Sequence, residues 1–250
     1  MSELNIENTK AEYSIPAIVD RYISCVDDIG LWRSERLMFS EYLDAGDKIL
    51  DIGCGAGRTT FELYEMGYTD ITGLDLSEMM ISAARDIAKG RKLSVPFVVG
   101  NACALSYSAG IFDAVVFSFN GIMTIPTRKM RKKAFDEIYR VLKPGGVFIF
   151  TTHHMDNPDY FDYWNAECDK WDKSEQDERL FEYGDLIFSK TEEYGDVVNF
   201  IHIPPNGEVE ACLETSGFEL IFNEVRSKIC EENAAVMDFS ADCMFWVCRK

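Results

Sequence analysis

Short apolar runs alternate with stretches of helical periodicity between residues 48 and 152. Five of these runs should form buried parallel strands, at 48–52, 70–74, 95–99, 112–117 and 147–152. Between them apolar residues recur every three or four positions, as at Met79, Ala83 and Ile87, which is the period of an α-helix. The LKPGG sequence at 142–146 should end the second such helix, because proline and glycine interrupt helices. This alternation is typical of a doubly wound, mostly parallel α/β sheet.

The rest of the chain should complete a single domain over residues 1–250 around this core, which we place at 46–152. Residues 1–45 have a helical pattern and are too short for a domain, so we expect a helical flank on the sheet. Residues 153–205 are acidic and aromatic, and we interpret them as an inserted cap. Residues 206–250 should hold a helix and the closing strands of a seven-stranded, Rossmann-like sheet. The strands expected outside the core lie at 196–203, 218–225 and 243–250.

The charge balance argues against polyanionic partners. The chain has 43 acidic and 25 basic residues, for a formal net charge of -18. Such a chain repels phosphate backbones and anionic membranes, so we expect no nucleic acid partner and a neutral or cationic small-molecule acceptor. The basic cluster RKMRKK at 128–133 could contact a phosphate, but we interpret it as a solvated helix face. The oligomeric state stays open.

Cysteine usage and hydropathy indicate a cytoplasmic protein that does not span a membrane. The chain begins with a polar segment, so its eight cysteines are interpreted as reduced thiols. No CxxC pair occurs and histidines number only three, so we expect no metal site. The longest uncharged stretch, at 93–112, is interrupted by Pro96 and Gly100, which argues against a membrane span.

A glycine-rich turn follows the first strand, in the sequence DIGCGAGRT at 51–59. Gly53, Gly55 and Gly57 would let a ligand approach bare backbone. A dinucleotide site has the spacing G-x-G-x-x-G and a phosphate on the helix N-terminus. Here the spacing is G-x-G-x-G, and Asp51 precedes it, where an acid would repel a phosphate and suit an ammonium or sulfonium. The turn therefore disfavours a nicotinamide dehydrogenase, which remains the alternative.

A second acid, Asp75, stands at the end of the second strand. A carboxylate at that position can accept hydrogen bonds from both hydroxyls of a ribose. Together the two acids predict a ligand that contains a nucleoside and a positive charge.

These segments resemble class I S-adenosylmethionine-dependent methyltransferases that act on small molecules. DIGCGAGRT and LDLSEMM are similar to two motifs of that family; VVGNACAL resembles a third, with Asn101 where aspartate is usual, and FDAVVFSFNGI resembles the strand that closes the site. The resemblance implies S-adenosyl-L-methionine as cofactor, S-adenosyl-L-homocysteine as product and in-line methyl transfer to an N, O, S or C atom. The residues that it implies for cofactor binding are Asp51, Gly53, Cys54, Gly55, Gly57, Asp75, Leu76, Met80, Asn101, Ala102, Phe117 and Ser118.

No sequence motif identifies the residues that would bind the methyl acceptor. His153 and His154 follow the fifth strand, so either could take the acceptor's proton, or both could simply cap the strand end. His202 lies within an expected strand and is interpreted as structural. Aromatic residues of the cap between 160 and 183 either close over an acceptor or form a small core. Tyr13 and Trp32 of the N-terminal flank also either close over a ligand or belong to the core.

Two alternative functions stay open from the sequence. One is a protein that binds S-adenosylmethionine without transferring its methyl group. The other is a protein or RNA methyltransferase, against which the acidic balance counts.

Overall fold

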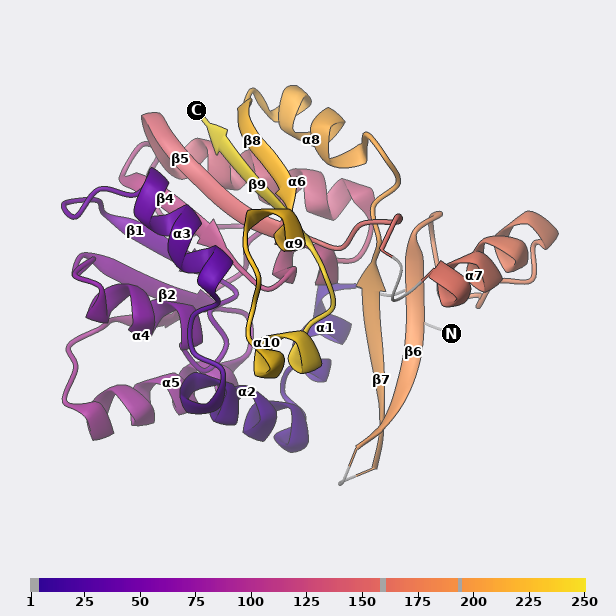
Figure 1. Ribbon diagram of the computed structural model, residues 1–250, viewed down its shortest axis with the longest axis horizontal. Helices are drawn as coiled ribbons and strands as arrows, with labels where there is room; N and C mark the ends of the chain where they lie inside the picture. Colours follow the sequence, from indigo (N-terminus) through magenta and orange to yellow (C-terminus); the bar gives the residue numbers. More distant parts are fainter. Residues whose placement is uncertain (1–4, 158–160, 193–194) are drawn as a thin grey trace.

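The computed structural model describes residues 5–157, 161–192 and 195–250. Its centre is a seven-stranded sheet with the order β3-β2-β1-β4-β5-β9-β8, in which β9 runs antiparallel to both of its neighbours (Figure 1). The strands are β1 Ile49–Ile52, β2 Ile71–Asp75, β3 Phe97–Val99, β4 Phe112–Phe117, β5 Leu142–Thr152, β8 Glu219–Val225 and β9 Met244–Arg249. The expected doubly wound, mostly parallel sheet of seven strands is confirmed.

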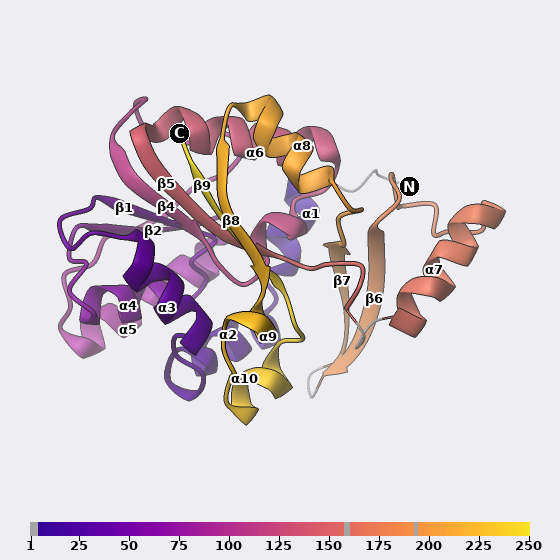
Figure 2. The same ribbon diagram turned by 45° about the horizontal axis from the view of Figure 1, so that its top comes forward.

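Helices cover both faces of the sheet (Figure 2). On one face, α2 (Pro16–Asp28), α3 (Arg33–Tyr42), α4 (Arg58–Glu65) and α5 (Glu78–Arg91) pack against Ile49 and its neighbours. On the other, α6 (Arg128–Val141) and α8 (Glu208–Ser216) pack against Leu50 and its neighbours. Successive residues of β1 thus enter opposite halves of the core, because side chains alternate along a strand.

The chain order around β1 fixes the place of a ligand crevice. The chain winds outward from β1 through β2 to β3 and then returns to β4 beside β1. In such sheets ligands bind outside the carboxyl ends of the strands at this reversal point. The glycine turn after Ile52 and the end of β4 at Phe117 lie there.

The LKPGG segment ends α6 at Val141, as expected, but it lies within β5 instead of before that strand. β5 already begins at Leu142, which pairs with Phe112, and the register shifts before Val147 pairs with Ala114. Gly145 has a φ of 81°, in the left-handed region that favours glycine. The proline and glycines therefore form an irregular first part of β5, which is compatible with a bulge rather than a separate turn.

The inserted segment stands beside the main sheet. It contains α7 (Phe161–Lys173) and a hairpin of β6 (Asp185–Glu192) and β7 (Gly195–His202), which form a separate two-stranded sheet (Figure 1). Strand β7 agrees with the strand expected at 196–203. The remaining short elements are α1 (Ile6–Glu12), η1 (Gly121–Thr124), α9 (Arg226–Ile229) and α10 (Ala234–Phe239). None of the helices in the described part of the chain is long and apolar enough to cross a membrane.

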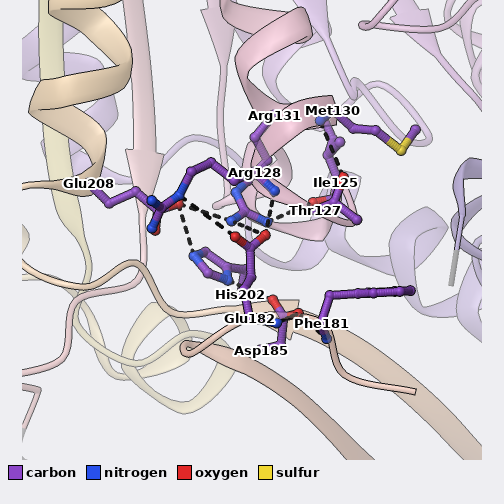
Figure 3. A network of polar contacts seen from close by, with 10 residues as sticks. All are labelled: Ile125, Thr127, Arg128, Met130, Arg131, Phe181, Glu182, Asp185, His202 and Glu208. Carbon is purple, nitrogen blue, oxygen red and sulfur yellow. Dashed lines mark hydrogen bonds and ion pairs between the residues drawn. The ribbon is translucent and has the colours of Figure 1, made fainter. Parts of the chain in front are cut away.

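A buried network of charges joins the hairpin to the main sheet (Figure 3). Arg131 of α6 is 1% exposed, and one of its guanidinium nitrogens lies 3.0 Å from Glu182 and 2.9 Å from Glu208. His202 of β7 lies between two carboxylates, with Nδ1 2.7 Å from Asp185 and Nε2 3.1 Å from Glu208. Burial would raise the pKa of Glu208, but the hydrogen bond and charge of His202 and of Arg131 outweigh it and lower the pKa to about 2.

This network corrects the interpretation of the basic cluster at 128–133 as a solvated face for Arg131, whereas Arg128, Lys129 and Lys133 are exposed as expected. Arg131 is buried, and Arg128 donates a hydrogen bond of 2.8 Å to Glu208. Positive charge at the start of a helix opposes the helix dipole, and the carboxylates of Glu182 and Glu208 offset that cost here. Periodicity could not show this, because the carboxylates come from segments about 50 to 80 residues further along the chain.

Candidate active site

The glycine turn after β1 packs closely against the end of β4. Gly53 has a φ of 65°, and a Cβ atom on it would lie 2.6 Å from Cε2 of Phe117. A Cβ atom on Gly57 would lie 2.6 Å from Cε2 of Phe61 in α4. Since atoms cannot approach that closely, a larger residue at either position would displace an aromatic ring. The glycines thus let the turn lie between two rings.

Asp75 at the end of β2 holds this turn in place. Its Oδ2 accepts a hydrogen bond from the backbone N–H of Gly55 at 2.9 Å, and its Oδ1 accepts one from the N–H of Ser77 at 2.8 Å. Burial raises the pKa of Asp75, and the backbone donors of Ser77 and Gly55 act in the opposite direction. An ionised carboxylate offers about four acceptor sites, so these backbone donors leave acceptor capacity for a ligand hydroxyl.

A first cavity of about 110 Å³ lies beside the turn. Ten of the twelve residues expected to bind a cofactor line it: Gly53, Cys54, Gly55, Asp75, Leu76, Met80, Asn101, Ala102, Phe117 and Ser118. The side-chain oxygen of Asn101 accepts a hydrogen bond from the N–H of Cys103 at 2.8 Å, so this amide is held in place. The structure therefore brings together residues that are up to 65 positions apart in sequence.

Asp51 and Gly57 do not line this cavity. Asp51 is 1% exposed, and its carboxylate accepts a hydrogen bond from the hydroxyl of Thr60 in α4. Burial raises the pKa of Asp51 to about 7, against the effect of the Thr60 hydrogen bond. Asp51 thus lies behind the turn and ties it to α4, rather than facing a ligand.

The N-terminal flank forms a wall of the first cavity that motifs could not reveal. Helix α1 contributes Ile6 and Thr9, the residue after it is Tyr13, and α2 contributes Tyr22. Arg58, at the start of α4, also lines it and is held by a buried ion pair with Glu35 of α3, at 2.6 and 2.7 Å. Of the two ambiguous flank aromatics, Tyr13 lines the cavity, whereas Trp32 is fully buried in a core cluster.

A second cavity of about 510 Å³ adjoins the first. Tyr13, Tyr22, Phe119 and Thr124 line both cavities. The hairpin adds Leu186, Asn199 and Ile201, α7 adds Tyr163, and the segment around α10 adds Phe239, Ser240 and Ala241. The flank, the inserted segment and the C-terminal segment therefore meet around one space next to the glycine turn.

Comparison with known proteins identifies the family. A family model described as a methyltransferase domain matches residues 49–146. The ubiquinone/menaquinone biosynthesis C-methyltransferase UbiE of Methylobacterium nodulans is 30% identical over 185 residues, which cover 72% of this chain and 69% of that protein. This chain belongs to the class I S-adenosylmethionine-dependent methyltransferases.

Other methyltransferases resemble this chain over larger or smaller parts of their length. Phosphoethanolamine N-methyltransferase 3 of Arabidopsis thaliana is 38% identical over 111 residues, which cover 44% of this chain and only 22% of that protein. A SAM-dependent methyltransferase from Methanosarcina mazei has the same fold, with a TM-score of 0.69, 23% identity and coverage of 89% of this chain and 99% of its own. The cofactor of the family is S-adenosyl-L-methionine, as the sequence implied.

The first cavity of this methyltransferase has groups that fit such a cofactor. Asp75 has acceptor sites for ribose hydroxyls, and the cradle at Gly53 leaves backbone exposed where a Cβ atom would fill the space. Leu76 and Met80 are apolar walls suited to an adenine ring. When bound, the cofactor supplies a methyl group that is already activated by a sulfonium.

The two histidines of the methyltransferase differ in position. His153 lines the second cavity, and burial, followed by the charges of His154 and His202, lowers its pKa to about 4. His154 lines neither cavity, and burial lowers its pKa too. Of the two histidines, only His153 therefore faces the second cavity, which adjoins the first.

Proposed function

We propose that this methyltransferase transfers the methyl group of S-adenosylmethionine to a small molecule held in the second cavity. The observation that carries the proposal is the sharing of Tyr13, Tyr22, Phe119 and Thr124 between the two cavities. An acceptor in the second cavity would adjoin the methyl donor in the first, and alignment of the two can lower the barrier by about 7–11 kcal/mol. A volume of about 510 Å³ is also in the range of small-molecule sites.

The proposal assigns roles to the residues of the first cavity. Asp75 accepts hydrogen bonds from the ribose, and Leu76, Met80, Asn101 and Ala102 surround the adenine. Gly53, Cys54 and Gly55 contact the methionine portion, whereas Phe117 and Ser118 close the side of the sulfonium. Asp51 and Gly57 support the turn without contacting the ligand.

The names of the relatives support a small acceptor, but they do not agree on which one. Their names include quinone biosynthesis and phosphoethanolamine, so a carbon atom is methylated in one case and a nitrogen atom in the other. The chain covers only part of the length of these proteins, so the acceptor must be inferred from its own cavity.

Filling the second cavity tests the proposal. Ala241 lines the second cavity and not the first, so Ala241→Phe should leave S-adenosylmethionine binding intact and block the acceptor. Ala211→Phe on the exposed face of α8 is the matched control. Release of S-adenosylhomocysteine is measured with a panel of small amines, phenols, thiols and quinols. We expect a loss of about tenfold or more in Ala241→Phe alone, since steric exclusion removes the alignment of the reactants.

Two results would contradict the proposal. One is turnover in Ala241→Phe equal to that of the control, which would place the acceptor elsewhere. The other is tight cofactor binding with no transfer to any member of the panel, which would favour a protein that only binds the cofactor.

A further inference from the structure

One carboxylate of the second cavity has no basic partner among the residues that the structure describes. Glu12, the last residue of α1, lines the cavity, and its Oε2 accepts a hydrogen bond of 3.4 Å from the backbone N–H of Phe200 in β7. Within the part of the chain that the structure describes, no basic side chain lies within ion-pair distance of Glu12, although it is partly buried. Burying an unpaired charge is costly, so a cation in the cavity would complete this site.

Aromatic rings surround the same space. Ring contacts run from Tyr13 to Tyr22 at 5.9 Å, from Tyr22 to Phe119 at 6.1 Å and from Phe119 to Phe239 at 4.9 Å between centroids. All four rings line the second cavity, and so does Tyr163. Ring faces attract organic cations, so the walls and the carboxylate favour the same kind of group.

We propose that the acceptor carries an amino group, that Glu12 binds this group as an ammonium, and that Glu12 takes its proton before methyl transfer. This inference rests on the proposed function, because it concerns the acceptor of the same site. It places the reacting nitrogen beside Tyr13, which borders both cavities.

The chemistry of the step balances. The ammonium of the acceptor gives one proton to the Glu12 carboxylate, which leaves a neutral amine and a carboxylic acid. The nitrogen lone pair then forms a bond with the methyl carbon, and the carbon–sulfur bond breaks. Its electron pair goes to sulfur, so the sulfonium becomes a neutral thioether and the methylated nitrogen carries the positive charge.

The other titratable groups of the cavity are less suited to this role. Burial raises the pKa of Tyr13 and of Tyr22 and also that of Tyr163, so these phenols stay protonated at neutral pH. His153, with a pKa of about 4, is a weak base. Burial raises the pKa of Glu12 to about 7, against the Phe200 hydrogen bond, and a base with that pKa exchanges protons near neutral pH.

One positive charge also borders the cavity. The guanidinium of Arg21 in α2 lies 5.1 Å from the centroid of the Phe239 ring. The Phe239 ring thus already contacts a cation, so we expect the amino group at the Glu12 end of the cavity.

A pair of probes of equal shape tests the inference by binding. Benzylamine and benzyl alcohol are titrated calorimetrically into protein saturated with S-adenosylhomocysteine at pH 8, where Glu12 is ionised. We expect benzylamine to bind at least about tenfold more tightly, which is typical of a hydrogen bond to a charged group. The preference should disappear in Glu12→Gln and persist in Glu7→Gln, an exposed position on the same helix. At pH 5 the preference should also fall in the wild type, because Glu12 is then protonated.

Three results would overturn the inference: no preference for the amine, a preference that survives Glu12→Gln, or no binding of either probe. The preceding titration with S-adenosylhomocysteine separates this failure from that of the proposed function. If S-adenosylhomocysteine binds and the amine preference is missing, the role of Glu12 is contradicted and the proposed function is not.

Discussion

Asp75 combines two roles in a single side chain. Its oxygens accept hydrogen bonds from Gly55 and Ser77, so it shapes the glycine turn as well as facing the cofactor cavity. Asp75 is the acidic side chain among the residues that line the first cavity, so it is the group best suited to accept hydrogen bonds from ribose hydroxyls.

Replacing this carboxylate should weaken cofactor binding. In Asp75→Asn we expect a loss of about 1.5–3 kcal/mol in the binding of S-adenosylmethionine, the usual range for hydrogen bonds to a charged group. The measurement is a calorimetric titration. Asp70→Asn, an exposed position just before the same strand, is the control and should bind as the wild type does. Equal affinity of the two variants would remove Asp75 from the ribose site.

The pKa of Glu12 gives stability a defined pH dependence. Its value of about 7 in the folded protein exceeds its ordinary 4.5, so the folded protein retains a proton that the unfolded chain loses between these pH values. The free energy of unfolding therefore falls as pH rises from 4.5 to 7 and stays lower above 7.

Replacing Glu12 with an uncharged residue should restore the stability that the protein loses as pH rises to 7. Without ligand, Glu12→Gln should be more stable than the wild type at pH 8 by about 2 kcal/mol, allowing for partial exposure, and similar to it near pH 4.5. Urea denaturation at both pH values measures the difference, with Glu7→Gln as control. A variant that is equally stable or less stable at pH 8 would show that the Glu12 charge carries no burial penalty.

At the residue scale, the sequence predicted the groups that local motifs place. The turn glycines and Asp75 are adjacent to strand ends, and a parallel sheet necessarily brings those ends together. Glu12 and Tyr22 could not be placed in this way, because their positions depend on how α1 and α2 pack on the sheet. Asp51 shows the opposite limit: its place in the motif was evident, but the direction of its side chain was not.

Among the elements, the hairpin β6–β7 depends on ionic contacts with the core. Arg131 connects Glu182, which precedes β6, with Glu208 of α8, and it also donates to the carbonyl oxygen of Ile125, which lines the cofactor cavity (Figure 3). The position of the hairpin is thereby tied to the segment that borders the site.

Breaking this network should be costly. We expect Arg131→Met to lower the free energy of unfolding by about 3–5 kcal/mol, because it leaves buried carboxylates without their partner. Lys132→Met removes a surface ion pair with Asp136 on the same helix and should cost no more than about 1 kcal/mol. Chemical denaturation of the two variants provides the comparison. Similar losses in both would mean that the buried network contributes no more than a surface pair.

Strands with a continuous apolar run were predicted from the sequence, whereas β6, with a mixed apolar and polar pattern, was not. The buried apolar runs of β1, β2 and β4 are continuous, so their existence was evident from the sequence. Strand β6 was not predicted, because in Asp185–Glu192 the apolar residues Leu186, Ile187 and Phe188 give way to a polar second half. The early start of β5 was hidden by Pro144, which usually marks a break.

On the scale of the whole molecule, the strand ends of the sheet border the first cavity, and the added segments form most of the second cavity, which we propose for the acceptor. The core at β1, β2 and β4 matches the family over residues 49–146, whereas the walls of the second cavity come largely from α1, α2, the hairpin and α10. Under the proposed function, acceptor choice depends on segments outside the part that the family model covers. The absence of nucleic acid among its acceptors, expected from the net charge of -18, stays a prediction.

The central claim is that the first cavity binds S-adenosylmethionine and not a dinucleotide. The most direct test is calorimetric titration of the purified protein with S-adenosylmethionine, S-adenosylhomocysteine and NAD in parallel. We predict that both sulfur nucleosides bind and NAD does not, because the G-x-G-x-G turn lacks the glycine spacing of a pyrophosphate site. Binding of NAD with no binding of the sulfur nucleosides would contradict the account and every residue role derived from it.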